Sequence, residues 1–290
     1  MFILKNILRY GWYEYRKRFR EPKIYVVILF LTFFLNITIR PLKITAEILN
    51  VSIPFGTSFL FMTNGYIYTV VGIALTVFMS DIIKTGNDIT DVKMRVNVKT
   101  EFFGKAILVF LLSITFTFIF FAEHLLLTVK YICFHNDWEA IGYTLSKTDM
   151  SEQMEGLIQF PYYVINEFSI HEAVLYEIGV IFLLCLLAGF IMLALNKMKK
   201  GFGGIIILFL LVFAANTIED SLNVSLIKIS PFSWLSLCNV TKVSEPFLPR
   251  MQYIFSSLLI LILIMLAAGY FMNVFLIQRI KTRRENKVNG

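Results

Sequence analysis

The chain has 290 residues, of which 57% are hydrophobic and only 16% are charged, and its mean hydropathy is +0.71. These values exclude an ordinary soluble domain, a disordered chain and a secreted disulfide-rich scaffold. The apolar residues stand in long runs, not in the alternating ten-residue segments of a membrane barrel, so helices must satisfy the backbone polar groups. The composition therefore predicts an all-α integral membrane protein.

The first 22 residues predict an amphipathic helix at the membrane interface. Apolar residues recur there at three- or four-residue spacing, and most of the basic residues fall outside that stripe, as is typical of interfacial helices. Pro22 then permits a bend into the first span. Anchoring on anionic lipid explains this segment as well as partner binding does. The stripe consists of Leu4, Leu8, Trp12, Tyr15 and Phe19.

Windows of about 20 residues predict six transmembrane helices in a single domain that covers residues 1–290. The first and fifth are short for a hydrocarbon core of about 30 Å, so tilt, local thinning or a non-spanning arrangement stays open for them. Residues 123–173 are predicted to form an acidic external segment. The six spans lie at about 24–39, 56–80, 103–122, 174–195, 202–218 and 253–277.

The distribution of charge predicts the orientation of these helices. Twenty of the 27 Lys and Arg residues, but only seven of the 20 acids, fall on the side that holds both termini and the 81–105 loop. The positive-inside rule places that side in the cytoplasm of a multi-pass protein. The net charge of +7 therefore reflects topology and gives no indication of nucleic-acid binding.

Signatures of catalysis and of ion-coupled transport are weak in this sequence. The nearest approach to a phosphate-binding loop is Gly104-Lys105, and the three His residues show no metal-ligand spacing, so the chain is predicted not to be an enzyme. Glu123 and Glu177 are placed near the outer ends of spans, which disfavours an ion-coupled carrier. His124 beside Glu123 is interpreted as an interfacial polar pair. Whether Cys133 and Cys238 pair stays open.

Besides the amphipathic entry segment Gly11 to Lys23, two segments carry a family resemblance. An acid, Asp81, leaves the second span; a Gly-Asn turn, then Val96-Asn97-Val98-Lys99, then Lys105 entering the third span follow it. This order resembles the permease pattern of the ABC type-2 transporter family, although Asp81 replaces a Glu and Val96-Asn97-Val98-Lys99 replaces the family's P-V-S-R. Ser230-Pro231-Phe232-Ser233-Trp234 resembles the S-P-x-x-W element of the family's outer re-entrant hairpin between the fifth and sixth helices.

The resemblance implies a permease that dimerises and docks a separately encoded ATPase, with ATP and Mg bound in that partner and no cofactor in this chain. The 81–105 loop would act as the coupling segment, with apolar residues filling an ATPase groove and basic residues steering the partner. The expected coupling residues are Asp81, Asp88, Ile89, Val92, Lys93, Met94, Arg95, Val96 and Lys99, and those of the outer hairpin are Ser230, Pro231 and Trp234.

The function expected from this resemblance is ATP-driven export of amphipathic or hydrophobic peptides or antimicrobials across a bacterial plasma membrane. In size and layout the chain is similar to the phenol-soluble-modulin exporters of Gram-positive bacteria. The alternative is a non-transport membrane anchor or sensor that docks a cytosolic regulator through the 81–105 loop. The identity of the substrate, the direction of transport and the choice between homo- and heterodimer stay open.

Overall fold

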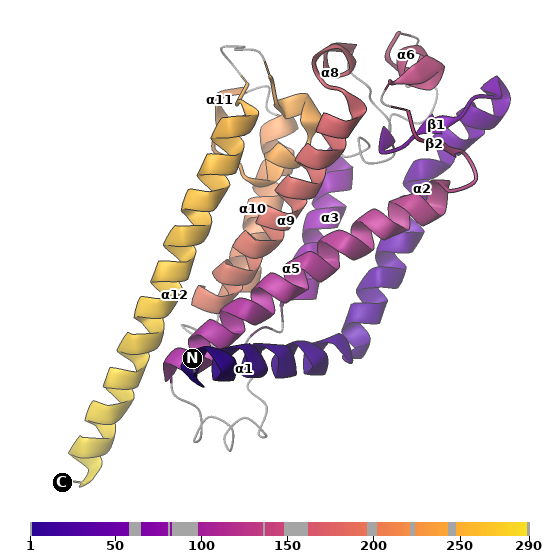
Figure 1. The fold of residues 1–290 in the computed structure, drawn as a ribbon. Helices are drawn as coiled ribbons and strands as arrows, with labels where there is room; N and C mark the ends of the chain where they lie inside the picture. Colours follow the sequence, from indigo (N-terminus) through magenta and orange to yellow (C-terminus); the bar gives the residue numbers. More distant parts are fainter. Residues whose placement is uncertain are drawn as a thin grey trace.

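The computed structural model of the chain is mostly helical (Figure 1). Four helices are long and apolar enough to cross a membrane, and they are α2 (Pro22–Leu49), α5 (Val98–Thr128), α9 (Ile170–Leu195) and α12 (Met251–Val288). Two shorter apolar helices are α3 (Gly65–Met79) and α10 (Gly203–Asp220). The residues that the structure describes are 2–57, 65–80, 82, 98–135, 137–147, 162–195, 202–220, 224–242 and 248–288.

Six apolar helices among the described residues lie in the order of the predicted spans, and several of them run beyond the predicted span limits. α2 continues through Arg40 and Pro41 to Leu49, well beyond the predicted end near residue 39. α5 extends beyond the predicted 103–122 at both ends. Glu101 and Lys105, both in its first turns, form an ion pair of 2.7 Å. Hydropathy windows stop at such charged residues, whereas a helical backbone does not.

Helix α9 forms the centre of the bundle. Its residues are apolar on every face, and it packs against α5, α12, α10 and α3. Glycines permit the closest of these approaches, because a Cβ at Gly189 would lie 2.4 Å from a methyl carbon of Val109 on α5, and one at Gly179 would lie 2.9 Å from the ring of Phe255 on α12. Small residues at such crossings let helix backbones approach closely in membranes.

The N-terminal helix α1 (Phe2–Phe19) packs across the beginning of α5 (Figure 1). The two helices touch where two glycines face each other, since a Cβ at Gly11 would lie 2.8 Å from the carbonyl oxygen of Gly104. The face of α1 turned to the bundle carries Gly11, Glu14 and Arg18, all of them buried. The first part of the predicted apolar stripe, including Leu8 and Trp12, is instead left exposed by the described chain.

At the opposite end of the bundle, short pairings join the connecting segments. Strand β1 (Ile53–Pro54) pairs in parallel with β2 (Ile132–Cys133), and the Tyr131 hydroxyl donates to the Glu47 carboxylate at the end of α2. These contacts tie the end of α2 to the end of α5. They also add a two-residue parallel pair to a fold that the sequence predicts as purely helical.

The connection between α5 and α9 is shorter than the predicted 123–173 segment, because α5 ends at Thr128 and α9 begins at Ile170. It contains α6 (Glu139–Lys147) and α8 (Tyr162–Glu167). The buried indole of Trp138, just before α6, donates a hydrogen bond of 2.7 Å to the carbonyl of Phe168, just after α8. Together with the β1–β2 pair, these helices cover the end of the bundle opposite α1 (Figure 1).

We predict that Gly11→Leu separates α1 from α5 and lowers the free energy of unfolding by about 1–3 kcal/mol, since the new side chain meets the Gly104 backbone. Denaturant titration in detergent measures this change. Tyr13→Leu, on the exposed face of the same helix, is the matched control. Equal stability of the two variants would contradict the close crossing.

Candidate functional site

Most of the predicted coupling residues lie outside the described part of the chain. Lys99 is described; it is exposed and lies in the first turn of α5. The coupling role therefore stays a prediction for the whole set, and the structure places only the two helices that flank it. The coupling residues outside the described part of the chain are Asp81, Asp88, Ile89, Val92, Lys93, Met94, Arg95 and Val96.

Polar contacts lie on both flanks of the 81–97 segment, one between elements and one within α5. The Lys23 ammonium, at the start of α2, donates a hydrogen bond of 2.8 Å to the Ser80 hydroxyl, which follows α3. Ser80 in turn donates to the carbonyl of Val77. On the other flank, Lys105 and Glu101 of α5 form their ion pair with little exposure, 9% and 15% of the respective side chains.

Polar groups gather where α1 crosses α5. Arg18 pairs with Glu21 at 2.7 Å, and Glu14 is buried on the same face of α1. The pKa of the Tyr10 phenol is raised well above its ordinary value, first by burial and then by the negative charges of Glu14 and Glu101. Polar groups therefore contribute to the contact between α1 and α5, the helix that follows the 81–97 segment.

The S-P-x-x-W segment forms a buried turn at the opposite end of the bundle. Trp234 lies in the 3-10 turn η2 (Phe232–Leu235) and is only 2% exposed. Its indole donates a hydrogen bond of 2.8 Å to the carbonyl of Ile227 at the end of α11 (Val224–Ile227), and its own carbonyl accepts one of 2.8 Å from the Tyr176 hydroxyl on α9. Trp234 is therefore a packing residue and not an exposed interfacial side chain.

The other residues of this turn are equally enclosed. Ser230 and Pro231 are buried, and the Ser233 hydroxyl donates to the Ser230 hydroxyl at 2.8 Å. The side-chain amide of Asn239, in the next turn η3 (Leu237–Asn239), donates to the Ser233 carbonyl at 2.9 Å. The η2 turn packs against α3, α9 and α10, so three helices meet at one buried, hydrogen-bonded turn.

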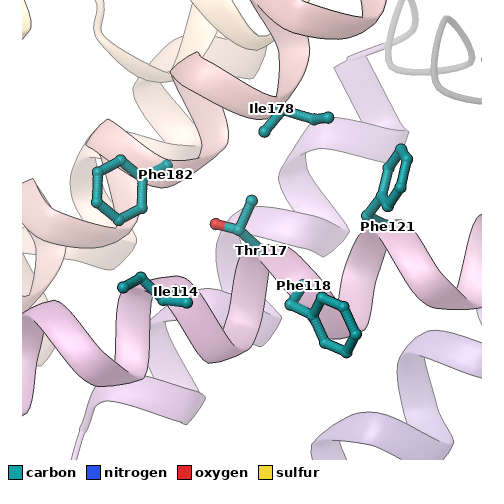
Figure 2. A pocket seen from close by; sticks show the side chains of 6 residues that line it. All are labelled: Ile114, Thr117, Phe118, Phe121, Ile178 and Phe182. Atoms are coloured by element: carbon teal, nitrogen blue, oxygen red, sulfur yellow. The ribbon is translucent and has the colours of Figure 1, made fainter.

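Figure 2 shows an apolar groove between α5 and α9, with a volume of about 270 Å³. The hydroxyl of Thr117 is the one polar side-chain group among its lining residues, and Phe118 at its edge is 68% exposed. A surface of this kind fits a hydrocarbon chain or another apolar group. The lining residues are Ile114, Thr117, Phe118 and Phe121 from α5, and Ile178 and Phe182 from α9.

The structure separates Glu123 from His124 and shows that Glu177 is buried. Glu123 accepts a hydrogen bond of 2.9 Å from the Thr32 hydroxyl of α2, while the Nδ1 of the buried His124 ring donates to the Phe120 carbonyl at 2.9 Å. Glu177 is the eighth residue of α9 and is fully buried, a burial that its predicted place near the end of a span does not imply.

Sequence patterns do not reveal the packing of Gly104 and Tyr176 or the burial of Glu177. Gly104 attracts notice only as part of a distant match to a phosphate-binding loop, although a glycine within an amphipathic or apolar helical pattern is itself a sign of close packing. Tyr176 and Glu177 carry no local motif, and only the tertiary structure shows their burial.

Cysteine and metal chemistry add little to these sites. Cys133 and Cys238, both within the described residues, are not joined by a disulfide. Over the described ranges, no group of three or more His, Cys, Asp or Glu side chains is arranged to hold a metal ion.

Comparison of the chain with protein-family models, with curated proteins and with solved structures gives no match. The resemblance to ABC type-2 permeases therefore rests on sequence motifs alone.

Tyr10 gives a prediction for alkaline pH. Above about pH 10 the phenol of the unfolded chain ionises while that of the folded protein keeps its proton, so the stability contributed by Tyr10 is lost as the pH rises. The unfolding free energy of the wild type should fall relative to that of Tyr10→Phe, by at most about 1.4 kcal/mol per pH unit and by less because Tyr10 is half-buried. Trp12→Phe is the non-titrating control, and parallel pH profiles would refute the assignment.

The contact between Tyr176 and the turn gives a second prediction. Tyr176→Phe removes the hydroxyl that donates to the buried carbonyl of Trp234 and should lower the free energy of unfolding by about 1–3 kcal/mol. Tyr253→Phe removes a comparable but exposed bond to the Lys228 carbonyl and should change it by less than about 0.5 kcal/mol. Equilibrium unfolding followed by tryptophan fluorescence compares the two.

Proposed function

We propose that the chain is the permease subunit of an ATP-driven ABC exporter that crosses the plasma membrane with six helices. It works with a second permease copy and with a separate ATPase subunit that binds ATP and Mg. The cargo is an amphipathic or hydrophobic peptide or antimicrobial that moves out of the cell. The end of the bundle with α1 and the 81–97 segment faces the cytoplasm, as the charge distribution predicts.

One observation supports this proposal: the two segments that resemble the family both adjoin the same helix, α3. The 81–97 segment follows α3, and Ser80, the residue after its last turn, is bonded to Lys23. Near the middle of α3, Gly72 packs under Val212 of α10 and near Phe232 of the S-P-x-x-W turn, and the Tyr68 hydroxyl donates to the Ala215 carbonyl at 3.2 Å. Gly72 lies about 12 Å along the helix from Ser80, so α3 links the two segments directly.

This arrangement supports a physical route for coupling. An ATPase that moves the 81–97 segment displaces the ends of α3 and α5 together, because both helices start or end there. α3 passes the displacement to α10 and to the buried turn, and α5 passes it to α9 along their long contact. Packed helices transmit such shifts because interiors have low compressibility.

The competing function is a membrane anchor or sensor that docks a cytosolic regulator through the 81–105 loop. The observation that favours it is the exposed stripe of α1, where Leu4, Leu8 and Trp12 are uncovered beside exposed basic residues such as Arg9 and Arg16. A surface of this composition suits an anionic membrane, and anchoring by itself needs no transport.

Affinity purification of the tagged protein from its native membrane separates these functions. We expect an ATP-hydrolysing subunit to co-purify with the wild type and to be lost in the double variant Lys93→Glu with Arg95→Glu, because charge reversal there repels the partner. Lys5→Glu with Arg9→Glu, on the exposed face of α1, is the matched control and should retain the ATPase. Mass spectrometry and ATPase assay of each eluate provide the readout.

Purification of the permease without any ATPase would refute the exporter proposal. Loop-dependent capture of a non-ATPase regulator would establish the sensor instead.

A further inference from the structure

Glu177 is a buried acid for which the described structure provides no partner. Its exposed fraction is 0%, and neither oxygen of its carboxyl group has a hydrogen-bond partner. It lies within α9, the most enclosed of the helices that could cross a membrane. A carboxyl in such surroundings is held either by a proton or by a positively charged partner, because the unpaired ion is strongly unfavourable in an apolar interior.

The described chain does not supply that positive charge. The buried Lys and Arg side chains among the described residues are Arg18 and Lys105, and both belong to the α1 end of the bundle. The hydroxyl of the neighbouring Tyr176 is engaged with the carbonyl of Trp234. A second acid in the same half of the bundle, Glu123 on α5, has one oxygen bonded to Thr32 and one buried oxygen without a partner.

The surroundings of Glu177 favour an organic cation over an inorganic one. Calcium takes six or more oxygen ligands and magnesium needs a complete octahedral shell. Over the described residues no cluster of three or more potential ligands exists. A single carboxylate is instead the ordinary partner of an ammonium or guanidinium group, with which it forms a short charge-assisted hydrogen bond.

The groove between α5 and α9 indicates the rest of the ligand. Ile178, the residue after Glu177, lines the groove together with Phe182, Phe118 and Phe121 (Figure 2). Consecutive side chains leave a helix about 100° apart around its axis. A ligand that contacts both Glu177 and Ile178 therefore extends around the side of α9. Apolar lining beside a buried acid is complementary to a molecule with an apolar body and one positive charge.

We propose that Glu177 binds the positively charged group of an amphipathic organic cation whose apolar body occupies the groove between α5 and α9. All the residues of this site come from one copy of the chain. The inference rests on the exporter proposal only where it treats the ligand as the transported cargo. It identifies the chemical class of the ligand as a hydrophobic ammonium or guanidinium compound, peptide or otherwise.

The test uses the full-length protein in lipid nanodiscs and the apolar reagent dicyclohexylcarbodiimide. This reagent adds to protonated carboxyl groups in apolar surroundings and leaves a stable N-acylurea, which peptide mass spectrometry locates. We expect one adduct at Glu177 in the wild type. Dodecylammonium should slow its formation at least about tenfold, whereas dodecanol, with the same chain and no charge, should not.

Two variants sharpen the result. Glu177→Gln should lose the protected adduct and bind radiolabelled dodecylammonium at least about tenfold more weakly in equilibrium dialysis, a change of about 1.4 kcal/mol. Glu47→Gln, whose native carboxyl is 55% exposed, is the matched control and should behave as the wild type. Because the adduct is mapped in the wild type, the test does not depend on the folding of either variant.

Three outcomes would overturn the proposal: no adduct at Glu177, an adduct that dodecanol blocks as well as dodecylammonium does, or cation protection that acts equally at Glu123. None of these measurements needs ATP or the ATPase partner. Failure here is therefore distinguishable from failure of the exporter proposal, which the purification experiment decides separately.

Discussion

Close packing around α9 is the constraint on which the rest of the structure depends. Within lipid there is little hydrophobic driving force between helices, so association relies on van der Waals contact and on satisfied polar groups. α9 meets this requirement with a helix that is apolar all round and with Gly179 and Gly189 at its closest crossings. α5, α12, α10 and the buried turn at Trp234 all take their positions from contact with it.

Polar groups are placed mainly at the two ends of this bundle. At one end Arg18 pairs with Glu21 at the turn between α1 and α2, and Glu101 pairs with Lys105 within α5. At the other, the hydrogen bonds of Trp234 and its neighbours close the turn on three helices. This division gives the described part of the molecule two polar ends joined by an apolar middle.

The sequence predicted the order of the apolar helices because long apolar runs leave the backbone little alternative to a helix. Two of these helices run past the predicted spans, at Arg40 and at Glu101, because a charged residue lowers the local hydropathy without interrupting the helical hydrogen bonds. The sequence also predicted an amphipathic first helix, but not which face meets the protein, since the docking face is defined by Gly11 opposite Gly104 and not by hydrophobicity. The burial of Glu177 and the role of Tyr176 depend on neighbours distant in sequence, which a single chain without its fold cannot reveal.

Three helices of this protein meet pairwise at three corners. α1 and α2 join at a turn braced by Arg18 and Glu21, α1 crosses α5 at its glycine contact, and α2 meets α5 through the β1–β2 pair (Figure 1). Three rigid helices joined in a closed triangle keep their mutual angles unless one helix bends or one of the three contacts breaks. We therefore expect α1, α2 and α5 to turn as one rigid unit and to carry α9 with them where it packs against α5.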